Sequence, residues 1–219
     1  MPLVNTDLIL QILEAGAVLA SAVAGMIMAA QKRMDLVGAF ALACVNAFGG
    51  GTLRDLLLDN RPFYWIAHWE YLIAIFAICL PFVYSVRMFQ IASAVHRKSV
   101  KMDATGLALF TITGTGIALT QDAPLVVAVL MGVIAGTTGG VLRDVVVNEV
   151  PDLFRPGGLY ASASFVGAAA FVFALTQGVE YPYAAAFGIA LIIVMRLLSV
   201  RLGIGIPRPQ WEDRPPPPA

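Results

Sequence analysis

The chain has 219 residues, of which 59% are hydrophobic and only 13% are charged, and its formal net charge is zero. Soluble domains average roughly 45–50% apolar and about 25% charged residues, so this composition excludes an ordinary soluble protein and indicates a membrane protein. The balanced charge argues against nucleic acid as a partner, and the apolar segments leave no room for a separate soluble domain.

Seven apolar segments reach the length of about 17–25 residues that a transmembrane helix needs. In chain order they are residues 8–30, 36–58, 69–91, 102–119, 124–147, 159–177 and 183–202. The first has no basic residue before it and is too long for a signal peptide, so we interpret it as a span. We therefore expect an all-α membrane protein with seven transmembrane helices.

An internal repeat relates the first three segments to the next three. The phrase Gly-Gly-x-Leu-Arg-Asp occurs at residues 50–55 and again 89 positions later, so that Arg54 corresponds to Arg143. We interpret the chain as a first three-helix repeat, a second repeat, an unrepeated seventh helix and a disordered, proline-rich cytoplasmic tail. Their residues are 7–90, 96–179, 182–203 and 204–219. Because each repeat has three spans, the second enters the membrane from the opposite side, which predicts inverted repeats.

Basic residues predict the orientation of these spans. Nearly all Lys and Arg residues in the loops and at the span ends fall on one side, where they are Lys32, Arg33, Arg87, Arg97, Lys98, Lys101, Arg155, Arg201, Arg208 and Arg214. The loops of the other side carry only Arg61. By the positive-inside rule, the N-terminus lies outside the cell and the C-terminus lies in the cytoplasm.

Glycines gather near the middle of the second and fifth segments. They are Gly49, Gly50 and Gly51 in the second, and Gly136, Gly139 and Gly140, with Thr137 and Thr138 between them, in the fifth. Each glycine costs a helix interior roughly 1 kcal/mol relative to alanine. We predict that both helices break there and that the freed backbone lines a water-filled pore. Close packing of two helices through small residues is the alternative interpretation.

A charged pair follows each glycine cluster, Arg54 with Asp55 and Arg143 with Asp144. Sequence neighbours on a helix do not face each other, so each arginine is expected to need a partner elsewhere. Glu14 and Asp103 occupy equivalent positions of the two repeats, at depths that match the two arginines. We predict ion pairs between Glu14 and Arg54 and between Asp103 and Arg143, one near each pore mouth, with a purely structural role as the alternative.

The aspartates have a local interpretation as well. If the second helix restarts after its glycines, Thr52 becomes its N-cap and Asp55 completes a capping box three residues later. Elsewhere, Cys44, Cys79, His68 and His96 lie within or at the ends of spans without a nucleophile–base pattern or a set of metal ligands. We expect neither an enzyme nor a bound cofactor or metal.

The doubled glycine phrase, the strings Arg33-Met34-Asp35 and Lys101-Met102-Asp103 and the seven spans resemble the bacterial branch of the trimeric intracellular cation (TRIC) channel family. Its domain is also labelled glycine transporter-like. The resemblance covers about residues 7–203. It implies a homotrimer in the bacterial inner membrane, in contact with membrane lipids, with a pore in each protomer that passes monovalent cations, chiefly potassium. The lipid-binding basic-acidic motif of animal members is absent from the second span here.

Three classes of function remain open. A cation channel needs a continuous hydrated path, whereas a secondary transporter of glycine or another small zwitterion needs an occluded site at the midplane. The midplane offers few polar side chains, chiefly Asn46, Thr111, Thr113, Thr115, Thr137 and Thr138. We therefore expect a channel, which the resemblance implies is for potassium, with a transporter as the first alternative and a non-transporting membrane scaffold as the second.

Overall fold

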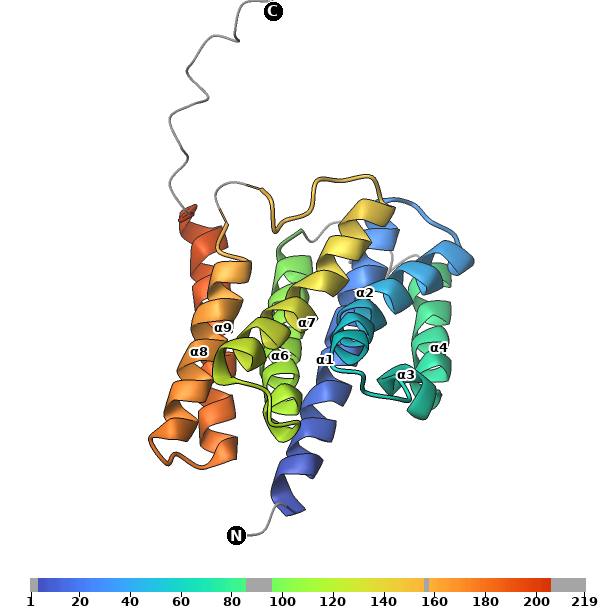
Figure 1. Ribbon diagram of the computed structural model, residues 1–219. Helices are drawn as coiled ribbons and strands as arrows, with labels where there is room; N and C mark the ends of the chain where they lie inside the picture. The colour runs from blue at the N-terminus through green and yellow to red at the C-terminus, as the bar shows by residue number, and fades with distance from the viewer. Residues whose placement is uncertain (1–3, 86–95, 156–157, 206–219) are drawn as a thin grey trace, which may run out of the picture.

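The computed structural model describes residues 4–85, 96–155 and 158–205, and these form a bundle of α-helices (Figure 1). The helices are α1 (Val4–Gln31), α2 (Leu36–Leu57), α3 (Tyr64–Ala67), α4 (Glu70–Tyr84), α6 (His96–Thr120), α7 (Leu125–Val146), α8 (Ala161–Thr176) and α9 (Tyr181–Leu202). The start of α1 and the end of α9 lie at opposite ends of the bundle (Figure 1). The expected all-α membrane protein is confirmed.

Five of these helices are long and apolar enough to cross a membrane, namely α1, α2, α6, α7 and α9. Helices α4 and α8 have 15 and 16 residues, fewer than the about 20 that a straight span needs. The predicted third span ends within residues 86–95, which lie outside the described residues, as does the predicted tail from residue 206 onwards. Seven spans therefore stay a prediction, and the one-turn helix α3 was not predicted.

Four helices form the centre of the bundle. Helix α1 packs on α2 and α6, and α7 packs on the same two helices. On one side α4 lies against α2 and α1, while on the other α8 lies against α7 and α6, and α9 covers α8 and α6 (Figure 1). Large apolar side chains such as Val126, Phe173 and Leu202 are exposed on the outside. Such a surface suits contact with lipid rather than with water.

The ends of the helices follow the sequence repeat. The left-handed residues Arg33 and Asp122 lie 89 positions apart just after α1 and α6, and Asp59 and Asn148 stand in the same relation after α2 and α7. The backbone N–H of Asn60 donates to the carbonyl oxygen of Asp55. In the second copy, the backbone N–H of residue 149 donates to the carbonyl oxygen of residue 144 in the same way. The two copies therefore turn in the same way at equivalent positions.

Helices α2 and α7 run through their glycines without interruption. The predicted breaks at Gly49, Gly50 and Gly51, and from Gly136 through Thr137, Thr138 and Gly139 to Gly140, are therefore wrong, and Thr52 is not an N-cap. The physical reason lies in the packing of the two helices. A Cβ on Gly50 would collide with a backbone carbonyl group of α7. The glycines therefore allow two continuous helices to approach closely, rather than breaking either helix.

Candidate functional site

The first candidate cluster joins α1 to α2 through a buried arginine. Arg54 is 1% exposed, and its Nη2 atom donates to Oε1 of Glu14 at 2.7 Å. The predicted ion pair between Glu14 and Arg54 is confirmed. The Nε atom of Arg54 also donates to Oδ1 of Asp55 at 2.8 Å, so the expectation that these neighbours do not meet is wrong. The arginine side chain is long enough to reach back to the following residue. The angle between the Cβ directions of two neighbours on a helix does not take this reach into account.

The second candidate cluster repeats this geometry between α6 and α7. Nη1 of Arg143 donates to Oδ1 of Asp103 at 2.7 Å, and Nε donates to Oδ1 of Asp144 at 2.9 Å. The predicted ion pair between Asp103 and Arg143 is confirmed. All three residues are buried. Each cluster therefore holds one guanidinium group and two carboxylates in a setting with little water.

The aspartate of each pair also anchors the loop that follows its helix. Oδ2 of Asp55 accepts the backbone N–H of Tyr64 at 3.2 Å. In the second copy, Oδ2 of Asp144 accepts the backbone N–H of Asp152 at 3.1 Å. Breaking a buried ion pair by removing one partner typically costs about 3–5 kcal/mol, because it leaves an uncompensated charge. These clusters consequently fix both the helix pairs and the loops beside them.

Reciprocal glycine contacts bring the backbones of α2 and α7 together. A Cβ on Gly50 would meet the carbonyl oxygen of Ala135, and one on Gly139 would meet the carbonyl oxygen of Asn46. Positions 46 and 135 are equivalent in the two repeats, as are positions 50 and 139. In one contact α2 supplies the glycine and α7 the carbonyl oxygen, and in the other α7 supplies the glycine and α2 the carbonyl oxygen. Gly136 lies instead against α6, beside the hydroxyl of Thr111. Close packing therefore explains these glycines.

Two further glycines lie beside the ion pairs. The Cβ position of Gly51 is 3.9 Å from Oε1 of Glu14, and that of Gly140 is 3.8 Å from Oδ1 of Asp103. The surroundings differ, because the hydroxyl of Tyr160 contacts Gly140, whereas the other side chains beside Gly51 are Arg54 at 3.8 Å and Phe110 at 4.0 Å from its Cβ position. The two clusters therefore contain the same charged groups, but different side chains pack beside them.

The polar residues of the central helices are mostly bound within their own helices. The hydroxyl groups of Thr111, Thr115, Thr137 and Thr138 each donate to the carbonyl oxygen four residues earlier, and Nδ2 of Asn46 donates to the carbonyl oxygen of Ser21 at 2.6 Å. Thr113 donates to the carbonyl oxygen of Phe110 at 3.3 Å. These donors are occupied, so they are poorly placed to bind a zwitterionic substrate.

Arg196 on α9 is a buried arginine that the sequence reasoning missed. Its side chain is 4% exposed, its Nη2 atom lies 2.6 Å from Oδ2 of Asp152, and its guanidinium carbon lies 4.7 Å from the ring centre of Tyr160. An arginine inside an apolar span was the available signal, since such residues are rare and face the protein interior.

A charged network outside the spans joins the two repeats. Nζ of Lys32, after α1, lies 2.5 Å from Oε1 of Glu149, and Nη2 of Arg155 lies 2.9 Å from Oε2 of the same residue. Hydrogen bonds from these two cations hold the pKa of Glu149 below its ordinary value. The loop between α7 and α8 is thereby tied to the turn between α1 and α2.

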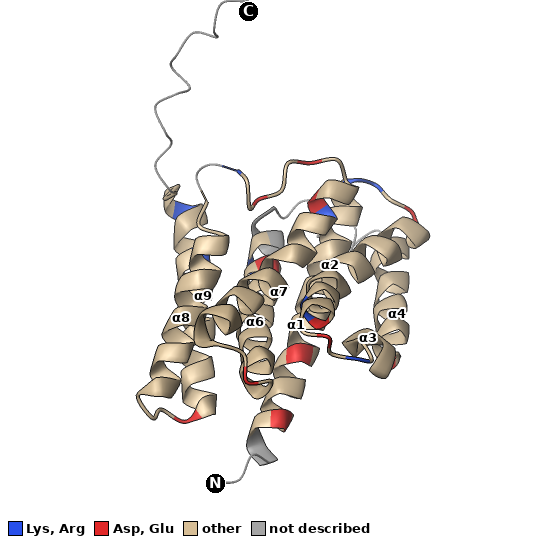
Figure 2. Cartoon of the chain, viewed as in Figure 1, with Lys and Arg blue, Asp and Glu red and all other residues tan. Residues whose placement is uncertain are grey.

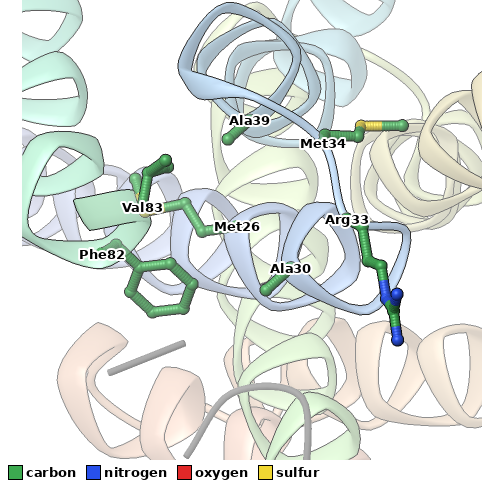
Figure 3. A pocket seen from close by; sticks show the side chains of 7 residues that line it. All are labelled: Met26, Ala30, Arg33, Met34, Ala39, Phe82 and Val83. Atoms are coloured by element: carbon green, nitrogen blue, oxygen red, sulfur yellow. The ribbon is translucent and has the colours of Figure 1, made fainter. Parts of the chain in front are cut away.

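A separate cavity of about 260 Å³ lies between α1, α2 and α4 (Figure 3). The residues that line it are Met26, Ala30, Arg33, Met34, Ala39, Phe82 and Val83. None of them belongs to the two candidate clusters, and the walls are apolar except at Arg33. This cavity is not part of the candidate site.

Comparison with known sequences identifies relatives along most of the chain. The sequence model of a family described as glycine transporter matches residues 11–87 and 100–177. A membrane protein of Vibrio cholerae is 34% identical over 187 residues, which cover 85% of this chain and 77% of the relative. The inner membrane protein YadS of Escherichia coli K12 is 33% identical over 192 residues, covering 85% of this chain and 89% of the relative.

Solved structures show the same fold. The trimeric intracellular cation channel orthologue from Rhodobacter sphaeroides superimposes with a TM-score of 0.82 at 33% identity, covering 90% of this chain and 99% of that one. A second structure, described as a TRIC cation channel in work on conductance, superimposes with a TM-score of 0.80 at 29% identity. That match covers 93% of this chain and 98% of the other.

Proposed function

This chain belongs to the TRIC family, whose sequence model is described as glycine transporter, and we propose on that premise that it is a monovalent cation channel. The proposed pore lies inside each protomer, is lined by α2 and α7, and passes potassium. One observation carries the proposal. Each of these helices holds a buried arginine that is matched by two carboxylates, in the same geometry, in both repeats.

The charge of the clusters supports cations over anions. If both carboxylates are ionised, each cluster carries a net charge of minus one. At an effective dielectric constant near 20, one such charge attracts a monovalent cation about 5 Å away by about 3 kcal/mol. In that state the arginines near the proposed mouths do not repel cations, because the two carboxylates of each cluster more than neutralise the charge of its guanidinium group.

An inverted repeat with seven spans is part of the proposal. The reciprocal contacts of Gly50 with Ala135 and of Gly139 with Asn46 are what a two-fold relation between the repeats produces. The start of α1 and the end of α9 lie at opposite ends of the bundle, as an odd number of spans requires (Figure 1). Most basic segments lie at the end of the bundle where α9 ends (Figure 2). This distribution supports a cytoplasmic C-terminus and an N-terminus outside the cell.

The proposed lining differs from a broken helix. Helices α2 and α7 are continuous, so the pore wall would consist of the helix sides around Gly51 and Gly140 and of the charged groups beside them. The remaining site residues, Gly49, Gly50, Gly136, Thr137, Thr138 and Gly139, would support that wall by packing. We propose further that the protein forms a homotrimer in the bacterial inner membrane, where lipids and neighbouring protomers cover its exposed apolar sides.

A secondary transporter of glycine or another small zwitterion is the second candidate, because the matching family model is described as glycine transporter. The occupied donors of the central threonines argue against it. Purified protein in proteoliposomes distinguishes the two functions. A channel gives passive potassium flux without a coupling ion, whereas a transporter accumulates labelled glycine only when an ion gradient is present.

A further inference from the structure

The guanidinium group of Arg54 has one nitrogen without a partner. Its Nη2 atom contacts both carboxylates of the first cluster, at 2.7 Å from Oε1 of Glu14 and 2.7 Å from Oδ1 of Asp55, and its Nε atom also donates to Asp55. The Nη1 atom is buried and has no hydrogen-bond partner among the residues that the structure describes. One edge of a buried cation is therefore left without an acceptor from that part of the chain.

The equivalent arginine of the second cluster uses all of its side-chain nitrogens. Nε and Nη2 of Arg143 both contact Oδ1 of Asp144, and Nη1 donates to Oδ1 of Asp103. The carboxylate from the neighbouring helix differs by one methylene group, because Glu14 stands where the second repeat has Asp103. The longer side chain contacts Nη2, whereas the shorter one contacts Nη1. The free Nη1 atom of Arg54 thus accompanies a difference in sequence.

A buried nitrogen in this position needs an acceptor. Arg54 is 1% exposed, so bulk solvent does not supply one. An N–H group that is buried without an acceptor loses the hydrogen bond that it makes to water in the unfolded chain, and this loss is largest for a charged donor. Ordered water commonly satisfies buried polar groups of this kind. The Nη1 atom consequently marks a small binding site within the first cluster.

The charges of the cluster restrict the ligand of this site. A cation cannot accept a hydrogen bond from Nη1. An anion would be repelled, because the cluster already has two carboxylates for one guanidinium group. A neutral oxygen acceptor remains, and water is the smallest one. Water can also donate its own hydrogens to a carboxylate such as that of Glu14.

We propose that Nη1 of Arg54 binds one water molecule inside the first cluster, and that Arg143 binds none because Asp103 takes the same place. The extra methylene group of Glu14 is the sequence difference that creates the site. This inference concerns the packing of the cluster and stands independently of the proposed channel function.

Radiolytic labelling tests the site without any measurement of transport. X-ray pulses convert water into hydroxyl radicals, and a bound water then oxidises the side chain beside it. Phe110 reports on the first cluster, because it is 3% exposed and its ring lies 4.0 Å from the Cβ position of Gly51, next to the guanidinium group. Phe154, which is 66% exposed in the loop between α7 and α8, controls for the dose.

We expect Phe110 to be oxidised in the wild-type protein despite its burial. Glu14→Asp gives the first cluster the carboxylate length of the second, so that this carboxylate binds Nη1 and displaces the water. The oxidation of Phe110 should then fall several-fold, while that of Phe154 stays unchanged. An unlabelled Phe110 in the wild type, or equal labelling of Phe110 in both proteins, would overturn the inference.

A density map of the wild-type protein that resolves ordered water needs no variant. We expect a water peak about 2.7–3.2 Å from Nη1 of Arg54 and no such peak at Nη1 of Arg143. A well-resolved Arg54 side chain without this peak would contradict the proposal. Density larger than one water that appears only with added glycine would contradict it as well, and would favour the transporter.

Discussion

Removing the arginine and removing its partner carboxylate should have very different effects on stability, because each cluster has more acidic groups than basic ones. Arg54→Met leaves Glu14 and Asp55 buried without a cation, whereas Glu14→Gln leaves Arg54 paired with Asp55 in a neutral cluster. We expect the first change to lower the free energy of unfolding by about 3–5 kcal/mol. The second should cost about 1 kcal/mol, since glutamine still accepts a hydrogen bond.

Thermal unfolding in detergent measures this difference. In a protein of this size 1 kcal/mol shifts Tm by about 2–4 °C, so Arg54→Met should lower Tm by about 10 °C and Glu14→Gln by only a few degrees. Arg143→Met and Asp103→Asn provide the matched pair in the second repeat. Equal shifts for the arginine and the carboxylate variants would refute the reasoning, because they would mean that the surplus carboxylate is as necessary as the cation.

Two further predictions concern packing and pH. Gly50→Ala should destabilise the protein by about 1–3 kcal/mol, because its methyl group collides with the backbone of α7. Its neighbour Gly51→Ala has 3.8 Å of clearance and should gain up to about 1 kcal/mol from helix propensity. Thermal melts of both variants check this opposite sign, and equal losses would contradict it. The lowered pKa of Glu149 adds stability above the ordinary value of 4.5, which is lost as the pH falls through the folded-state pKa. Glu149→Gln should remove this part of the pH dependence of Tm, and parallel wild-type and variant profiles below that pH would show that Lys32 and Arg155 do not stabilise the carboxylate.

The sequence predicted those features that depend on pattern alone. A repeat that extends over two copies of three apolar segments located the helices, and equivalence within it paired Glu14 with Arg54 and Asp103 with Arg143. Both inferences needed only spacing, depth and charge. They hold because an ionisable group inside a span has few alternatives to a partner at the same depth.

The glycines could not be interpreted from the sequence, because a glycine string has two physical outcomes. It can end a helix, or it can let another backbone approach, and only the position of α7 against Gly50 decides between them. The reach of an arginine side chain back to its own neighbour was underestimated for Asp55 and Asp144. Arg196 could have been found as a charge within an apolar span, although its contacts with Asp152 and Tyr160 come from segments distant in the sequence.

The charge of the two clusters is tested most directly by the reversal potential of the purified protein in a planar bilayer with a potassium chloride gradient. A cation channel whose mouths each carry a surplus carboxylate reverses close to the potassium equilibrium potential, and Glu14→Gln with Asp103→Asn moves the reversal toward zero. A wild-type reversal at zero or near the chloride potential, or no current together with gradient-driven glycine accumulation, would contradict the proposed function.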